Sequence, residues 1–242
     1  MCTLTFIPKK KGFILTNSRD ELFSRPTISP KKYTIFGHNL IFPKDEKKGG
    51  TWLVLGENKV ICLLNGSKRK PVLKNFYEES RGNLVLNLFQ YEKTQLFFEQ
   101  ESFEEVPPFT MVVFDYENDL KIEEISWNGF EKNLENINSK IPKIWSSSTL
   151  YNSEQRAERK KWFEVFSQEE SNLMDEKILY FHQKKHTEKS DNNILMKRDH
   201  GKETTSISQI IIKENEKSFY FKNILDQKST TILWAEKEMD LQ

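Results

Sequence analysis

The chain has 242 residues, with 37 basic and 36 acidic side chains and a formal net charge of +1. This balance argues against a protein built mainly to bind nucleic acid or an acidic membrane surface. A hydrophobic content of 36% in a chain of this length is enough for a proper core, and we expect one domain over residues 1–242. No apolar run approaches the roughly 18–20 residues that cross a bilayer. With Cys2 and Cys62 as its only cysteines, the sequence favours a reducing, cytoplasmic setting.

The start of the chain offers a nucleophile. Cysteine is the second residue, and methionine aminopeptidase removes an initiator Met when the next side chain is small. The trimmed chain would carry a thiol and an α-amine on Cys2, and the amine, with an ordinary pKa of ~7.7–8.0, lies close enough to take the thiol proton. The alternative is that Cys2 is a small apolar side chain in an N-terminal strand.

The first two expected strands bring a guanidinium and a carboxylate toward this residue. They cover residues 3–7 and 13–16, joined by a lysine-rich turn. If Ile7 faces Phe13, then Cys2 faces Ser18, and Arg19 and Asp20 emerge beside the chain start. Arg19 would favour the thiolate, and Asp20 would hold the α-ammonium or pair with Arg19. The alternative is an ordinary turn pair.

The rest of the pattern alternates short strands with a few helices. Further strands are expected at residues 33–36, 40–42, 51–55, 60–64, 109–115, 121–127, 204–213, 219–221 and 230–234. Helices are expected at residues 80–91, 94–100, 154–166 and 171–186, the last with Met174 on its apolar face. Strand pairs at both ends of the sequence, with helices between them, suit two stacked sheets flanked by two helical layers.

Three short stretches have both a structural and a functional interpretation. Gly49 and Gly50 permit a close backbone approach, as a floor under the nucleophile or as a flexible turn. Asn65 precedes Gly66 at a strand end, as a turn residue or as an amide that donates to an oxyanion. The hydroxyl-rich residues 145–151 form a helix-capping loop or part of a substrate pocket.

The histidines are weak metal candidates. His182 and His186 are four residues apart and share a helix face. A zinc site needs a third ligand and usually a carboxylate partner, and the sequence supplies neither a His-Glu-x-x-His pattern nor a cysteine pair. We therefore expect no metal.

Several short motifs, spread in order along nearly the whole chain, resemble those of the NRDE family, whose eukaryotic members are called Transport and Golgi Organization protein 2. They are Met1-Cys2-Thr3, Thr16-Asn17-Ser18-Arg19-Asp20-Glu21 with Arg25, Gly49-Gly50-Thr51-Trp52, Leu64-Asn65-Gly66, Ser80-Arg81-Gly82, residues 145–151 with Arg156, Arg159, Trp162 and Phe163, and Thr204-Thr205-Ser206-Ile207. The motif that gives the family its name, Asn-Arg-Asp-Glu, has Ser18 in place of its Asn.

The resemblance implies a fold and a chemistry. The family resembles N-terminal nucleophile hydrolases, which are α+β proteins with a four-layer αββα sandwich of two mainly antiparallel sheets, such as the cysteine amidases. It implies Cys2 as the nucleophile, Arg19 and Asp20 as its immediate partners and Asn65 as an oxyanion donor, acting on a small-molecule amide or related acyl compound. The residues that we expect to bind this substrate are Asn17, Ser18, Glu21, Arg25, Thr51, Trp52, Ser147, Ser148, Thr204 and Ser206.

The resemblance also suggests an alternative function that involves no catalysis. Some family members are linked to haem handling, and a small-molecule carrier would keep the fold and the thiol. In that case Cys2 or His200 would ligate haem iron, as thiolates and imidazoles do. Otherwise we expect no cofactor. The sequence makes no prediction of oligomeric state.

Overall fold

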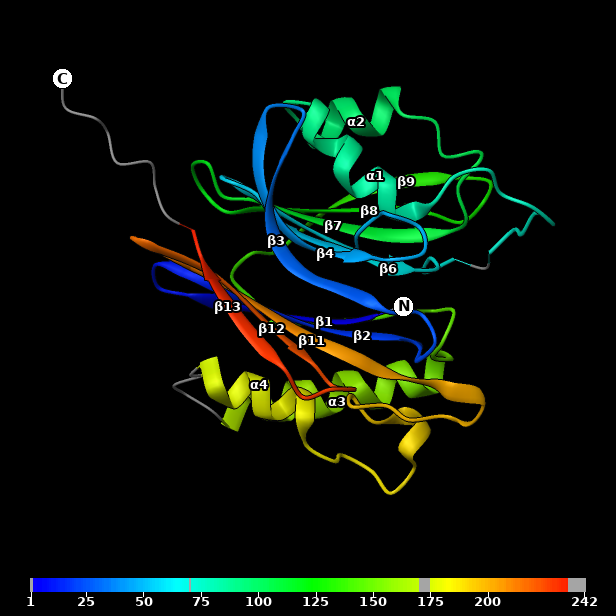
Figure 1. The fold of residues 1–242 in the computed structure, drawn as a ribbon, viewed down its shortest axis with the longest axis vertical. Coiled ribbons are helices and arrows are strands. Elements are labelled where there is room, and N and C mark those ends of the chain that lie inside the picture. The colour runs from blue at the N-terminus through cyan, green and yellow to red at the C-terminus, as the bar shows by residue number, and fades with distance from the viewer. Residues whose placement is uncertain (1, 70, 170–174, 235–242) are drawn as a thin grey trace.

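The protein is an α+β structure of two antiparallel sheets (Figure 1). It is a computed structural model that describes residues 2–69, 71–169 and 175–234. The first sheet has the strand order β10-β1-β2-β11-β12-β13. Its strands are β1 (Cys2–Lys9), β2 (Gly12–Leu22), β10 (Lys143–Ser146), β11 (Lys202–Lys213), β12 (Glu216–Asn223) and β13 (Ser229–Leu233).

The second sheet runs in the order β3-β4-β5-β6-β7-β8-β9. Its strands are β3 (Thr27–Ile35), β4 (His38–Asp45), β5 (Leu53–Leu55), β6 (Lys59–Asn65), β7 (Phe109–Asp115), β8 (Lys121–Trp127) and β9 (Lys132–Ile137). The apolar run in β6 is buried on both faces, as expected for a strand covered on both sides.

The helices lie on the outer faces of the two sheets (Figure 1). Within the described residues the α-helices are α1 (Arg81–Asn87), α2 (Thr94–Gln100), α3 (Ser153–Glu169) and α4 (Asp175–Gln183). The helix expected at residues 80–91 ends as an α-helix at Asn87 and continues as the 3₁₀ turn Leu88–Gln90. Of the helix expected at residues 171–186, residues 171–174, including Met174, lie outside the described residues.

Two apolar clusters hold the layers together. Phe6, Phe13 and Phe114 meet between the sheets, with ring centroids 5.6–6.1 Å apart. Ile7 and Ile14 lie on the other face of β1 and β2 and pack against α3 and α4, in a cluster with Phe163, Phe166, Ile178 and Phe181. Both faces of β1 and β2 are therefore buried, one by a sheet and one by helices. The order helices, sheet, sheet, helices is compatible with the expected sandwich.

The expected strands are present, and two were missed. In β9 three of the six residues are exposed and none is buried, so its sequence shows no apolar face. The short β10 ends at Ser146, inside the hydroxyl-rich residues 145–151 where we expected a loop. None of the helices in the described residues is long and apolar enough to cross a membrane.

Candidate active site

The pairing of β1 with β2 places Cys2 directly opposite Arg19. The expected pairing of Cys2 with Ser18 is wrong by one residue, because Ile7 faces Ile14 rather than Phe13. Residues directly opposite in an antiparallel pair project to the same face, with Cβ atoms ~4.5–5.5 Å apart. The one-residue difference therefore moves Arg19 onto the face of Cys2 and Ser18 onto the opposite face.

Arg19 is held between the sheets by a carboxylate that the sequence did not indicate. Its Nη2 lies 2.8 Å from Oδ2 of Asp45, and the same oxygen lies 2.7 Å from Nε of Arg25. Arg25 also reaches Glu21 at 3.2 Å. Burial lowers the pKa of Arg19, while Glu21, Asp45 and Cys2 raise it. Asp45 therefore compensates much of the charge that we expected to act on Cys2 alone.

Trp52 and Asn17 complete this inner face. The Arg19 guanidinium lies over the Trp52 ring, 4.6 Å from its centroid, a cation–π contact. Trp52 Nε1 donates to Asn17 Oδ1 at 3.1 Å, and Asn17 Nδ2 donates to the Thr3 carbonyl at 3.2 Å and contacts Cys62 Sγ at 3.6 Å. Asn17 thus ties β2, β1 and the second sheet together, a positioning role.

Asp20 points away from Cys2. Its carboxylate accepts hydrogen bonds from Tyr151 Oη and Thr204 Oγ1, each at 2.7 Å, on the helical side of the first sheet. Burial raises its pKa, against the attraction of Arg159 and these two bonds. The expected pairing of Asp20 with Arg19 is absent, because neighbouring residues on a strand project to opposite faces.

Ser18 lies on the same helical side, bonded to a buried histidine. Its Oγ lies 2.7 Å from His182 Nδ1, and Thr5 Oγ1 lies 2.8 Å from Nε2. Burial lowers the pKa of His182 to about 3, and His186 and Arg159 add to this effect. His182 is therefore a neutral link between α4 and the first sheet. His186, four residues on, stacks against Trp162 instead.

Six expected site residues line one small pocket, which we call the Arg19 pocket. They are Arg19, Glu21, Arg25, Thr51, Trp52 and Asn65. Its volume is about 80 Å³, and Asp45 and Arg81 also line it. The backbone of Gly50 closes one side, because a Cβ there would lie 2.8 Å from the Gly82 carbonyl carbon. Of the paired glycines, Gly50 makes a close backbone approach, to Gly82, whereas Gly49 has a positive φ of +73°.

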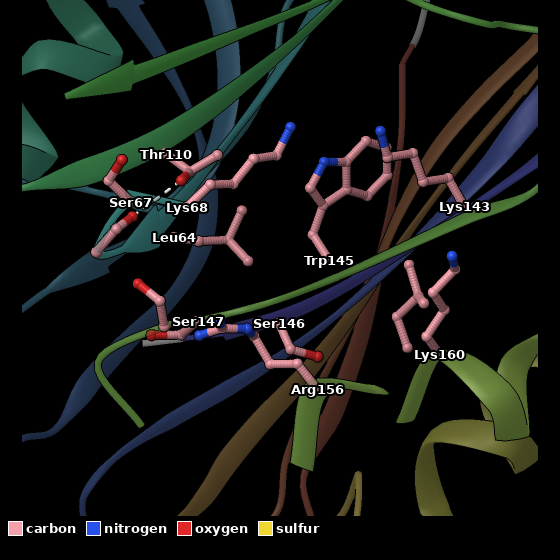
Figure 2. A pocket seen from close by; sticks show the side chains of 13 residues that line it. Leu64, Ser67, Lys68, Thr110, Lys143, Trp145, Ser146, Ser147, Arg156 and Lys160 are labelled. Atoms are coloured by element: carbon pink, nitrogen blue, oxygen red, sulfur yellow. Dashed lines mark hydrogen bonds between the residues drawn. The ribbon is translucent and has the colours of Figure 1, made fainter. Parts of the chain in front are cut away.

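Ser147 links Cys2 to Asn65. Its backbone N–H donates to the Cys2 carbonyl at 3.0 Å, and its hydroxyl donates to the Asn65 carbonyl at 2.7 Å. Ser147 and Ser148 line a second pocket of about 240 Å³, which we call the serine pocket and which also contains Ser67 and Ser146 (Figure 2). One residue thus connects the candidate nucleophile, the candidate oxyanion donor and this second pocket.

The remaining expected site residues lie outside both pockets. Within the described part of the chain these are Cys2, Asn17, Ser18, Asp20, Thr204 and Ser206. Cys2 is 0% exposed, so its side chain has no contact with solvent in this structure. Met1 itself, whose removal we expect, lies outside the described residues. Ser206 pairs with Arg19 across β11 and β2, and its buried hydroxyl has no hydrogen-bond partner among the described residues.

Haem ligation by Cys2 or His200 stays a prediction. The Arg19 pocket and the serine pocket, at about 80 and 240 Å³, are smaller than the ~300–1,000 Å³ typical of ligand cavities. His200 is exposed in the short turn Asp199–Gly201. Among the described residues, no group of three or more His, Cys, Asp or Glu side chains is placed to hold a metal ion.

Sequence reasoning missed several residues that shape the site. Asp45 lies 26 positions from its partner Arg19 and in the other sheet, and nothing local signals the pair. Arg159 was noted only as part of a motif, although it is fully buried and donates to Thr3 Oγ1 at 2.5 Å. Predicting that Arg159 is buried among polar groups of β1 would have required knowledge of how α3 packs on the sheet.

These features define a class: an α+β protein of two antiparallel sheets that buries a cysteine–arginine pair between them. The chain matches the family model described as Transport and Golgi organisation 2 over residues 1–240, and it belongs to that family. The match confirms the resemblance drawn from the motifs. A search of the curated proteins found no match.

Proposed function

We propose that this chain, once Met1 is removed, is an N-terminal cysteine hydrolase that cleaves a small-molecule amide or related acyl compound. In this proposal the two sheets and their outer helices form the four-layer αββα sandwich of the N-terminal nucleophile hydrolases. Cys2 is the nucleophile and its own α-amine is the general base. The two free thiols suit a reducing compartment, and we propose a cytoplasmic location.

The observation that carries the proposal is the bridge made by Ser147. Its backbone N–H donates to the Cys2 carbonyl at 3.0 Å and its hydroxyl donates to the Asn65 carbonyl at 2.7 Å. The backbones of the proposed nucleophile and of the proposed oxyanion donor are therefore both hydrogen-bonded to Ser147. Arg19 faces Cys2 from the next strand and shares a pocket with Asn65. A nucleophile, a cation and an amide donor are the parts that acyl transfer needs, and the proposal brings them together once the Cys2 thiol reaches the Arg19 pocket.

The chemistry follows from these positions. The α-amine of Cys2 takes the thiol proton, and the thiolate attacks the carbonyl carbon of the substrate. The Asn65 amide and a backbone N–H hold the negative oxygen of the tetrahedral intermediate. The protonated amine then gives its proton to the leaving nitrogen as the C–N bond breaks. Water, deprotonated by the same amine, hydrolyses the thioester and frees Cys2.

In this proposal Asp20 has the first of the two roles expected for it, holding the α-ammonium group, and not the second, pairing with Arg19. Its neighbour on β2, Arg19, is the residue that pairs with Cys2. Removing Met1 leaves the α-amine of Cys2 at this end of the strand. Asp20, held by Tyr151 and Thr204, is the carboxylate that would orient this ammonium group from the helical side.

The proposal requires that trimming gives the Cys2 thiol access to the Arg19 pocket. This requirement separates it from the rival, a carrier that binds a small molecule without cleaving it. A carrier needs neither Met1 removal nor a reactive thiol, so it would bind its ligand equally well in the chain that keeps Met1.

Acyl-enzyme trapping tests the proposal. The trimmed protein is incubated with a panel of amides, esters and thioesters, and intact mass spectrometry follows covalent adducts and products. We expect an adduct on the wild type and on Cys62→Ala, which removes the buried thiol of β6, and none on Cys2→Ala. Adducts or turnover that survive in Cys2→Ala would contradict the proposal. A trimmed wild type that turns over no member of the panel would favour the carrier.

A further inference from the structure

The serine pocket is ringed by positive charge that the proposed chemistry does not use. Lys68 follows β6, Lys143 lies on β10, and Arg156 and Lys160 lie on α3. Arg156 and Lys160 are four residues apart and therefore share a helix face. Figure 2 shows these four side chains around the pocket, with Leu64 and Trp145 among the residues that line it.

Two of the four cations have no carboxylate to balance them. Lys68 pairs with Glu124 at 2.6 Å and Glu135 at 3.0 Å, and Lys160 reaches Glu164 at 3.5 Å. Lys143 instead lies 5.0 Å from the centre of the Trp145 ring, and Arg156 Nη1 donates to the Tyr151 carbonyl at 2.9 Å. Across the described residues neither Lys143 nor Arg156 has an acidic partner within ion-pair distance.

Burial and neighbouring charges both act on Lys143. Burial lowers its pKa, Glu124 opposes this shift, the ammonium group of Lys68 adds to it, and Glu135 and Lys160 have smaller effects of opposite sign. A bound anion would relieve both the desolvation and the repulsion, because each is a penalty on uncompensated positive charge.

Hydroxyl donors and an apolar wall complete the pocket. Ser67, Ser146 and Ser148 line it, and their hydroxyls have no hydrogen-bond partner within the described part of the chain. Leu64, Ile144 and Trp145 supply apolar surface beside them. Charged donors, hydroxyl donors and an apolar wall together suit an anionic head group attached to a carbon skeleton.

We propose that the serine pocket binds a phosphate monoester group carried by the substrate. Two uncompensated cations match a group that carries about −1.5 to −2 charge near neutral pH, whereas a carboxylate would balance only one of them. The volume of about 240 Å³ admits such a group with a short stretch of carbon skeleton. That the bound molecule is a substrate rests on the proposed function, in which Cys2 is the nucleophile. Ser147, which lines this pocket, is hydrogen-bonded to the Cys2 carbonyl.

Binding measured without catalysis tests this site independently of the hydrolase proposal. Inorganic phosphate, phenyl phosphate and benzoate are titrated into Cys2→Ala by calorimetry at constant ionic strength. We expect phenyl phosphate to bind most tightly, inorganic phosphate more weakly, and benzoate at least about tenfold more weakly than phenyl phosphate, the loss of one charge-assisted contact.

Substitutions in the pocket locate the binding. Lys143→Gln and Arg156→Gln, each made in Cys2→Ala, are expected to weaken phenyl phosphate about tenfold. Lys31→Gln, an exposed lysine of β3 away from the pocket, is the matched control and should leave the affinity unchanged.

The outcomes separate the two proposals. No phosphate binding, binding equal to benzoate, or binding indifferent to Lys143→Gln and Arg156→Gln would overturn the phosphate site even if the enzyme cleaves an amide. Binding that needs both cations supports the site even if Cys2 catalyses nothing.

Discussion

Replacing Asp45 by Asn should destabilise the protein far more than any surface charge change. The substitution keeps Oδ1 as acceptor for the Lys48 N–H at 2.9 Å and removes the charge that lies 2.8 Å from Arg19 and 2.7 Å from Arg25. Side chains of Asp45 and Arg19 are 8% and 4% exposed, so Arg19 is left as a buried, uncompensated cation. Removing one partner of a buried ion pair costs ~3–5 kcal/mol.

The structure places the expected value at the lower end of that range. Arg19 keeps hydrogen bonds to the Arg25 carbonyl and Thr205 Oγ1, both at 3.2 Å, and Arg25 keeps Glu21. We therefore expect a loss of about 3 kcal/mol in the free energy of unfolding. With a urea dependence of about 3 kcal/mol/M, the unfolding midpoint should fall by about 1 M.

Equilibrium urea unfolding, followed by tryptophan fluorescence and circular dichroism, measures this shift. The matched control is Glu214→Gln, which breaks the Lys11–Glu214 pair at 2.6 Å between side chains that are 64% and 59% exposed. Exposed pairs contribute ~0–1 kcal/mol, so the control should barely move the midpoint. Equal shifts in the two variants would show that Asp45 does not compensate Arg19 inside the protein.

Three further predictions follow from the site. Below pH 6.5 the unfolded chain binds a proton at His182 and the folded chain does not, since the folded pKa of His182 is about 3. The free energy of unfolding should therefore fall by about 1.4 kcal/mol per pH unit from this residue alone. Urea unfolding at pH 6.5 and 4.5 should show a smaller loss of stability in His182→Gln than in the wild type, and an unchanged loss in the exposed control His38→Gln. Gly66→Ala should destabilise the protein by about 1–2 kcal/mol more than Gly37→Ala. Both glycines have positive φ (+85° and +80°), but only a Cβ at Gly66 would crowd other atoms, the Ser148 hydroxyl and the Thr149 backbone nitrogen at 3.1 Å. Equal midpoints in thermal or urea unfolding would contradict the close contact. Asn65→Ala should lower kcat about 10²–10³-fold on any substrate that forms the Cys2 adduct, and an unchanged kcat would remove Asn65 from the oxyanion site.

The positions of the strands were predictable, but the register of the first pair was not. Alternation fixes a register only when one face is apolar and the other polar. In β1 both Leu4 and Thr5 are fully buried, one against a sheet and the other against helices, so the pattern does not distinguish the faces. The hairpin turn decides, since Lys9 pairs with Gly12, and this placed Arg19 rather than Ser18 opposite Cys2.

The parts of the site that depend on long-range packing could not be read from the sequence. The motifs picked out Arg19, Trp52 and Asn65, and these three residues line one pocket. The partners that set their charge come from distant segments: Asp45 from the other sheet, and His182 from a helix more than 160 residues beyond Ser18. Each is an ordinary polar residue in its own neighbourhood, and only the packing of the layers gives it a role.

The reactivity of the Cys2 thiol tests the central claim most directly. The trimmed protein, with Met1 loss checked by intact mass, is treated with iodoacetamide over a range of pH, and the carbamidomethylated residue is located by peptide mapping. The account predicts rapid modification of Cys2 with Cys62 unmodified until the chain unfolds. Retention of Met1, or a Cys2 as unreactive as Cys62 in the trimmed folded protein, would contradict it.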